Sequence, residues 1–99
     1  ICEINGYRWL LGQEADKEMN WYDAIEWCRS VSGELPPREV LLMAYFNEEI
    51  RPLFKPEFYW SSMEYNDTFA WEQCFSTGSQ FGNGKAGNVY VRAVKKVKI

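Results

Sequence analysis

Phe58 to Val94 reads FYWSSMEYNDTFAWEQCFSTGSQFGNGKAGNVYVRAV, and this stretch decides the fold. Residues 58–62 and 69–76 are short aromatic segments of the kind that form strands, and the polar residues 64–67 between them predict a turn. Residues 82–88 hold three glycines in seven positions and predict a loop. Rigid aromatic strands that carry a polar, glycine-punctuated loop are typical of a recognition surface. The stretch therefore favours a binding module.

Both ends of the chain predict strands. Asn5-Gly6 is the dipeptide that accepts a positive φ at both turn positions, so residues 1–11 predict a β-hairpin. The polar segment from Gly12 to Met19 predicts a loop. Residues 88–97 alternate between two faces, and this period of two predicts a final strand.

Two helices are expected between these strands. Asn20 can cap a helix start, with Asp23 three residues later, and apolar residues then recur at helical spacing until Gly33, which predicts the end. Pro37 suits the first turn of a second helix, and Asn47 predicts its end. The fold class is therefore α+β, with two helices packed on a twisted antiparallel sheet that contains the N- and C-terminal strands.

Composition limits the class of protein. The 99 residues predict one domain, spanning 1–99, and 46% hydrophobic and 17% aromatic residues are enough for a core. No apolar run of membrane-spanning length and no signal peptide is visible, although the first residue is Ile and a removed leader is one explanation. The net charge of −3 argues against a general nucleic-acid binder. Residues 73–99 are basic, and we favour solvating lysines over a site for an anionic partner.

Three cysteines, Cys2, Cys28 and Cys74, occur without a CxxC pair and without any histidine. A zinc site needs about four nitrogen or sulfur ligands, so neither a metal nor a cofactor is expected. We interpret Cys28 and Cys74 as buried thiols, and a disulfide between them is the alternative. The odd count favours a reducing compartment such as the cytoplasm.

Five segments in order, WYDAIEWC, GELPPREVLLMAYFN, YWSS, AWEQCFSTGS and GNVYVRAVKKV, resemble the Lcl C-terminal domain family of bacterial and phage proteins. The resemblance covers Trp21 to Val94. It implies a C-type-lectin-like fold related to that of formylglycine-generating enzymes, in a family of adhesive or ligand-binding domains and small phage proteins. This chain has Glu34-Leu35-Pro36-Pro37 where longer members have a WRLP segment, and no collagen-like region accompanies it. The lone domain therefore resembles a phage or prophage accessory protein more than an adhesin.

Several motifs have a structural and a functional interpretation. Trp60 and Trp71 are expected in the core, and a sugar-stacking platform would need one exposed ring. The polar residues around Asn66 favour a solvated turn with Asx hydrogen bonds over a calcium site. Arg92 is expected to pair with a carboxylate or to cap carbonyl groups, and Glu39 is the predicted partner.

Catalysis is not expected, because no histidine is available as a base and no serine or cysteine has an activating partner. We expect a non-catalytic module whose loops 63–69 and 77–88 contact a protein partner, with glycan binding as the alternative. Nucleic acid and membrane are not expected as partners. The predicted contact residues are Tyr65, Asn66, Asp67, Phe69, Gln80, Phe81, Asn83, Lys85 and Asn88.

Overall fold

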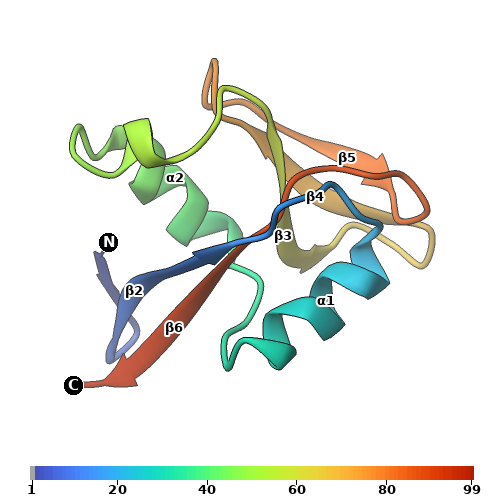
Figure 1. Ribbon diagram of the computed structural model, residues 1–99. Helices are drawn as coiled ribbons and strands as arrows, with labels where there is room; N and C mark the ends of the chain where they lie inside the picture. Colours follow the sequence, from blue (N-terminus) through green and yellow to red (C-terminus); the bar gives the residue numbers. More distant parts are fainter. Residues whose placement is uncertain (1) are drawn as a thin grey trace.

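The computed structural model describes residues 2–99 and shows two helices and two sheets (Figure 1). The elements in chain order are β1 (Cys2–Ile4), β2 (Tyr7–Glu14), α1 (Trp21–Ser30), α2 (Arg38–Phe46), the short 3₁₀ helix η1 (Arg51–Leu53), β3 (Phe58–Glu64), β4 (Phe69–Cys74), β5 (Gln80–Gly84) and β6 (Arg92–Lys98). The strands form two antiparallel three-stranded sheets, in the orders β1-β2-β6 and β3-β4-β5. The α+β class is as predicted, but the expected sheet is divided into two.

The segment before β6 connects the two sheets. Val89 bridges Met19, which follows β2, and Tyr90 forms a parallel bridge with Tyr59 of β3. The chain then enters β6, which pairs with β2. The segment around Tyr90 therefore lies beside the outer edge of β3 before the chain completes the terminal sheet.

The β1–β2 hairpin forms as predicted. Asn5 and Gly6 occupy the turn with φ of 53° and 80°, the backbone conformation that this dipeptide tolerates best. Strand β2 continues to Glu14, beyond Gly12, where a loop was expected. A register shift between Leu11 and Glu14 allows β2 to keep pairing with β6 over this longer distance.

Helix α1 begins as predicted but ends differently. The Asn20 side chain accepts a hydrogen bond from the backbone N–H of Asp23 at 2.9 Å. The left-handed residue after the helix is Ser32, with φ of 59°, and not Gly33. A Cβ at Gly33 would lie 3.0 Å from the carbonyl oxygen of Val94, so this glycine permits close packing against β6 instead of reversing the chain.

Helix α2 matches its prediction closely. Pro37 immediately precedes Arg38, the first helical residue, and Asn47 follows Phe46, the last. The helix packs over one face of the β3–β4–β5 sheet, where the Gln73 side chain donates a hydrogen bond of 2.7 Å to the carbonyl oxygen of Leu41.

The interior contains three apolar clusters. The largest lies between α1 and the sheets and includes Trp60, which is fully buried and donates a hydrogen bond of 2.9 Å to the carbonyl oxygen of Met19. A second cluster lies under α2, where Phe54 stacks on Phe75 with ring centroids 4.1 Å apart. A third joins Trp9 to α2 and β6. The core role predicted for Trp60 is confirmed.

Strand β5 was missed in the sequence, which predicted a loop over residues 82–88. Its residues Gln80–Gly84 pair in register with β4. Pairing with a neighbouring strand supplies backbone hydrogen bonds that do not depend on side chains, so two glycines are accommodated despite their low strand propensity.

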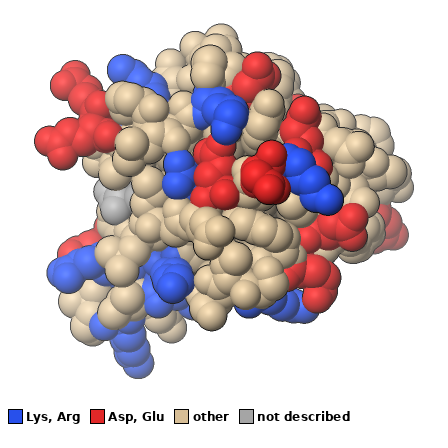
Figure 2. Space-filling view, viewed as in Figure 1, with Lys and Arg blue, Asp and Glu red and all other residues tan. Residues whose placement is uncertain are grey.

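Strand β1 and the end of β6 lie at one end of the molecule, in the β1-β2-β6 sheet (Figure 1). Basic side chains gather over this end, at the lower left of Figure 2, where β6 carries the exposed Lys95, Lys96 and Lys98. Within residues 2–99, neither helix is long and apolar enough to span a bilayer.

Candidate functional site

The predicted contact loops do not form one surface. The 65–68 turn joins β3 to β4, and the 75–79 turn joins β4 to β5. Successive turns of an antiparallel meander lie at opposite ends of the sheet. The 65–68 turn meets the residues that follow β5, since the N–H of Lys85 donates a hydrogen bond of 2.8 Å to the carbonyl oxygen of Thr68. The segment around Gly78 packs instead against Tyr45 of α2.

An aromatic cluster occupies the end of the β3-β4-β5 sheet that holds the 65–68 turn. We call Met63, Tyr65, Phe69, Trp71 and Arg38 the aromatic tip. The Tyr65 and Phe69 side chains are 58% and 41% exposed, and Met63 is 47% exposed. Phe69 and Trp71 point to the same face because they are two residues apart on β4.

Trp71 is the fixed centre of the aromatic tip. It is half-buried, with the Arg38 guanidinium 3.8 Å from its ring centroid and the Tyr65 ring edge-on at 5.1 Å. Arg38 is held in turn by Gln80, whose side-chain oxygen accepts a hydrogen bond of 2.8 Å from the Arg38 Nε. Trp71 is therefore neither purely a core residue nor an open stacking platform, and Arg38 was absent from the predicted site.

The 65–68 turn is ordered by its own hydrogen bonds. The Asn66 Oδ1 accepts from the backbone N–H of Thr68 at 2.9 Å and of Phe69 at 2.8 Å. This is the predicted Asx arrangement, and it occupies the oxygen atom that a calcium ion would need. Asn66 and Asp67 remain exposed at the edge of the aromatic tip.

Lys85 links this turn to α1, and its side chain is not available to a partner. Its side chain is 5% exposed, and its Nζ donates to Glu64 at 2.8 Å and to the carbonyl oxygen of Asp67 at 2.9 Å. The ammonium group also lies 4.8 Å from the Trp21 ring centroid. The hydrogen bond with Glu64 raises the pKa of Lys85, so the charge is retained.

Gln80 and Asn83, both predicted contacts, have internal partners. The Gln80 amide donates to the carbonyl oxygen of Arg38 at 3.0 Å and to Gln73 at 2.8 Å. Asn83 donates a hydrogen bond of 2.8 Å to Glu72. Burial raises the pKa of the Glu72 carboxyl, and the bond from Asn83 partly offsets that effect.

Phe81 and Asn88 lie apart from the aromatic tip. Phe81 is 51% exposed on the opposite face of the sheet, with its ring 6.3 Å from that of Phe58. Asn88 lines a shallow depression beside α1 together with Asp23 and Trp27. Of the nine predicted residues, Tyr65, Asn66, Asp67 and Phe69 are exposed side by side.

Arg92 has a different partner from the one predicted. Its guanidinium donates to the carbonyl oxygens of Gly12 at 2.9 Å and Leu53 at 2.5 Å, and it lies 3.4 Å from the Glu14 carboxylate. Glu39 is exposed and forms no ion pair among the described residues. The prediction of Glu39 was wrong because helix α2 directs that side chain toward solvent. Arg92 therefore both caps backbone carbonyl groups and pairs with a carboxylate, which is that of Glu14.

The three cysteines are unbridged, with Cys28 and Cys74 buried as predicted. Burial raises the pKa of the Cys28 thiol to about 12, and Glu34 adds to the effect. Burial acts in the same direction on Cys74, but hydrogen bonds from Ser76 and Thr77 outweigh it and lower its pKa. Across residues 2–99, no three acidic or cysteine side chains gather as a metal site would require.

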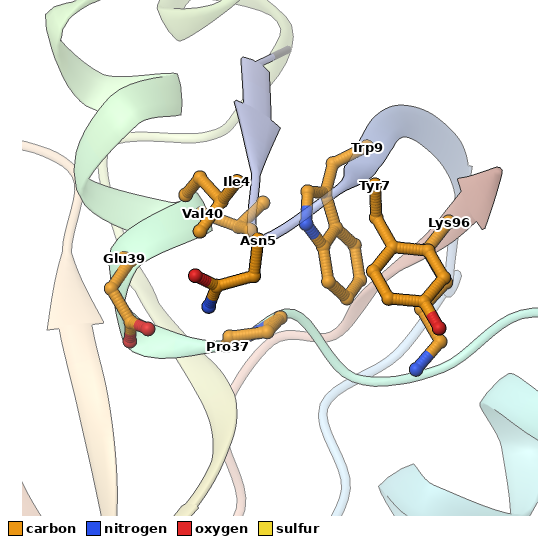
Figure 3. Close-up of a pocket in the computed structure, with 8 residues that line it drawn as sticks. All are labelled: Ile4, Asn5, Tyr7, Trp9, Pro37, Glu39, Val40 and Lys96. Atoms are coloured by element: carbon orange, nitrogen blue, oxygen red, sulfur yellow. The ribbon is translucent and has the colours of Figure 1, made fainter. Parts of the chain in front are cut away.

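A separate pocket of about 210 Å³ lies between the β1–β2 hairpin and the start of α2 (Figure 3). Trp9 and Tyr7 line one side of it and Glu39 the other, with Lys96 beside Tyr7. Ligand pockets usually measure roughly 300–1,000 Å³, so this one admits a single side chain at most. No local pattern in the sequence indicates this pocket, because its walls come from residues 4–9, residues 37–40 and Lys96, which are far apart in the chain.

Comparisons with known proteins bear on the fold. No protein-family model matches this chain, and no curated protein matches it in sequence. Among solved structures, the chain is similar to TC14, a C-type lectin from the tunicate Polyandrocarpa misakiensis, with a TM-score of 0.53 and 14% identity over 94% of this chain and 98% of that chain. Membership of the Lcl C-terminal domain family stays a prediction. The C-type-lectin-like fold is confirmed: this chain is an α+β domain of that architecture.

Proposed function

We propose that this chain is a non-catalytic binding module that takes a protein partner at the aromatic tip. The observation that carries the proposal is the grouping of the exposed Tyr65 and Phe69 beside the fixed Trp71–Arg38 pair, with the exposed Met63 on the adjoining strand β3. Tyrosine, tryptophan and arginine are the residues in which interface energy is most often concentrated. Asn66 and Asp67 supply a polar rim on the same turn.

The arrangement favours a protein partner because it is held rigidly. Phe69 and Trp71 project from β4, and the turn that carries Tyr65 is fixed by the Asx hydrogen bonds and by Lys85. Little conformational entropy is lost when such a surface binds. The resemblance to phage members of the Lcl C-terminal domain family supports a phage- or prophage-encoded accessory role.

The test compares two double variants that each remove two exposed apolar side chains. Tyr65→Ser with Phe69→Ser removes the tip, and Phe46→Ser with Leu53→Ser removes two side chains of 72% and 53% exposure elsewhere. Immobilised wild-type and control proteins should capture the same partner from a host lysate. The tip variant should lose at least about tenfold in affinity for that partner once purified, as measured by calorimetry.

Equal affinity of the tip variant and the wild type would contradict the proposal. So would loss of affinity in the Phe46 and Leu53 control. Amide spectra of both variants establish that the fold is intact, which separates a lost contact from a lost structure.

Glycan binding is the second candidate, favoured by the exposed Tyr65 ring beside Trp71 and by the lectin among the fold neighbours. Aromatic rings stack on sugar faces, and Asn66 and Asp67 offer polar groups nearby. Titration with a heparin-like polymer and with neutral oligosaccharides separates the candidates. Binding that disappears by physiological salt is nonspecific electrostatics and disfavours the glycan.

A further inference from the structure

Strand β5 forms an open sheet edge. It pairs with β4 on one side and has no strand on the other. Figure 1 shows it at the upper rim of the molecule, outside β4. Its sequence, Gln80-Phe81-Gly82-Asn83-Gly84, holds no charged residue and no proline. An edge of this kind is a template for pairing with another strand, and proteins usually protect such edges.

The outer edges of β1 and β3 are protected. Strand β1 has only three residues, and an ion pair between Glu3 and Arg8 crosses the β1–β2 hairpin. The outer edge of β3 is covered by other parts of the chain, because the backbone of Tyr90 both donates to and accepts from β3 and the carbonyl oxygen of Pro36 accepts from Ser62. The β1 edge is therefore short, and the β3 edge is occupied by other parts of the chain.

The outer edge of β6 is protected in a different way. At its start, Val94 pairs with Glu34 through two backbone hydrogen bonds of 2.9 Å. Beyond that point the strand carries exposed Lys95, Lys96 and Lys98, and charged side chains disfavour edge pairing. Within residues 2–99, β5 is thus the edge left without a covering segment, an ion pair or a lysine.

The hydrogen-bond pattern shows which backbone groups of β5 are available. The carbonyl oxygen of Ser79 accepts from Cys74, and the N–H of Lys85 donates to Thr68, both at 2.8 Å. In an antiparallel pair every second residue faces the neighbouring strand. The odd-numbered residues of this segment therefore direct their backbone groups toward β4.

The even-numbered residues Gln80, Gly82 and Gly84 direct theirs outward. The carbonyl oxygen of Gly84 accepts from Gly87 in the following turn. Among the described residues outside β4, none bonds to the backbone of Gly82. The middle of the edge thus offers a free backbone donor and acceptor at a residue that has no side chain of its own.

We propose that two copies of this chain pair antiparallel through their β5 edges, about a two-fold axis at Gly82. Gly82 then faces Gly82 of the other copy, and Gln80 faces Gly84, so the outward groups of both strands meet. The two β3-β4-β5 sheets become one continuous sheet, with the two aromatic tips on the same face. The inference stands independently of the proposed function, because it uses the edge and not the rings.

A second copy fits this edge better than a flexible peptide. Its β5 is already held as a strand by β4, so pairing does not incur the entropy loss of ordering a free segment. The pairing is isologous and brings no like charges together, since β5 has none. The edge has only five residues, whereas each side of a stable interface usually has about 20–30. The dimer is therefore weak and reversible.

The first test is self-association. Sedimentation equilibrium from roughly 10 µM to 1 mM should show the mass rising from that of the 11.7 kDa chain toward twice that value. Amide exchange supplies a signature that other interfaces lack: protection of the outward N–H of Gly82 should grow with concentration. The inward N–H of Phe81 and Asn83 should be protected at every concentration.

Charged variants at the axis make the test specific. A Cβ at Gly82 would meet Tyr65 and Phe69 at ordinary contact distances of 3.7 and 3.8 Å, so the first side-chain atom of Gly82→Lys or Gly82→Glu fits without a clash. Each variant alone should weaken self-association at least about tenfold, because equal charges face each other across the axis. An equimolar mixture of the two should restore it. Gln13→Lys and Gln13→Glu, exposed on β2, are the controls for net charge.

A monomer at about 1 mM overturns the proposal, given the affinities expected for an edge of this size. Self-association that the Gly82 variants leave unchanged overturns it too, because the interface then lies elsewhere. Protection of the Gly82 amide that requires a different added protein assigns the edge to that protein instead of a second copy.

Discussion

Arg92 joins three parts of the chain at the residue scale. Its guanidinium bonds to carbonyl groups at Gly12 in β2 and Leu53 in η1, and it faces Glu14 with both side chains about 15% exposed. Glu14 also accepts a hydrogen bond of 2.8 Å from the Tyr59 hydroxyl.

Replacing Arg92 by Met should therefore cost about 2–4 kcal/mol of unfolding free energy, because the carbonyl groups and Glu14 lose a charged partner away from water. Glu39→Gln should change stability by less than about 0.5 kcal/mol, since that side chain is exposed. Urea denaturation of both variants measures the difference. Equal stability of the Arg92 variant and the wild type would refute the structural role.

Cys28 makes stability depend on pH. Its folded pKa is raised to about 12 by burial, above the unfolded value, so the unfolded chain releases this proton first. Stability is fully present below the unfolded pKa and falls as pH rises above about 9. Thermal melts between pH 8 and 10 should show this decline, and it should be shallower in Cys28→Ala. An unchanged slope in the variant would assign the decline to other groups, such as Tyr59.

At the element scale, the end of α1 depends on two residues, although Gly33 alone was expected to end the helix. Ser32 takes the left-handed conformation, and Gly33 lies where the backbone approaches Val94 and Ala93. Sequence indicated a helix end near Gly33, which is correct. It did not indicate which residue reverses the chain, because close packing against β6 depends on the tertiary structure.

Ser32→Gly should raise stability by about 0.5–1 kcal/mol by relieving the positive φ. Gly33→Ala should lower it by about 1–3 kcal/mol, since the added Cβ would lie 3.0 Å from a carbonyl oxygen. Chemical denaturation of the two single variants tests both signs. If Gly33→Ala were neutral and Ser32→Gly destabilising, the assignment of these two roles would be wrong.

Local signals predicted the hairpin at Asn5-Gly6, the cap at Asn20 and the limits of α2. These features depend on residues a few positions apart, which sequence displays directly. Strand β5 was missed because its pairing comes from β4 and not from its own composition. The far end of β2, which extends to Glu14, was missed for the same reason.

At the scale of the whole molecule, the three apolar clusters share elements. Trp60 and Tyr59 are neighbours on β3, yet one belongs to the α1 cluster and the other to the α2 cluster. Val94 of β6 lies in the third cluster and Ala93 in the first. No sheet can unfold without exposing residues from more than one cluster.

We therefore expect a single cooperative unfolding transition. Tryptophan fluorescence, far-ultraviolet circular dichroism and the exchange of the slowest amides in both sheets should give the same free energy. A first transition that exposes only the β1-β2-β6 sheet would show that the clusters are independent.

The candidate site was predicted in part. Tyr65, Asn66, Asp67 and Phe69 lie together because they are close in sequence, around one turn. Arg38 joins them from α2, more than twenty residues away, and no local pattern indicates that approach. Lys85 seemed a natural surface contact by composition, but its side chain is buried and ion-paired with the exposed Glu64.

Strand β1 and the end of β6 lie on the opposite side of the molecule from the 65–68 turn, which carries part of the aromatic tip (Figure 1). A tether, dye or carrier protein joined to either terminus would therefore leave the tip unobstructed. A bait protein attached to a bead by its first or last residue would therefore present Tyr65 and Phe69 on the side that faces away from the bead.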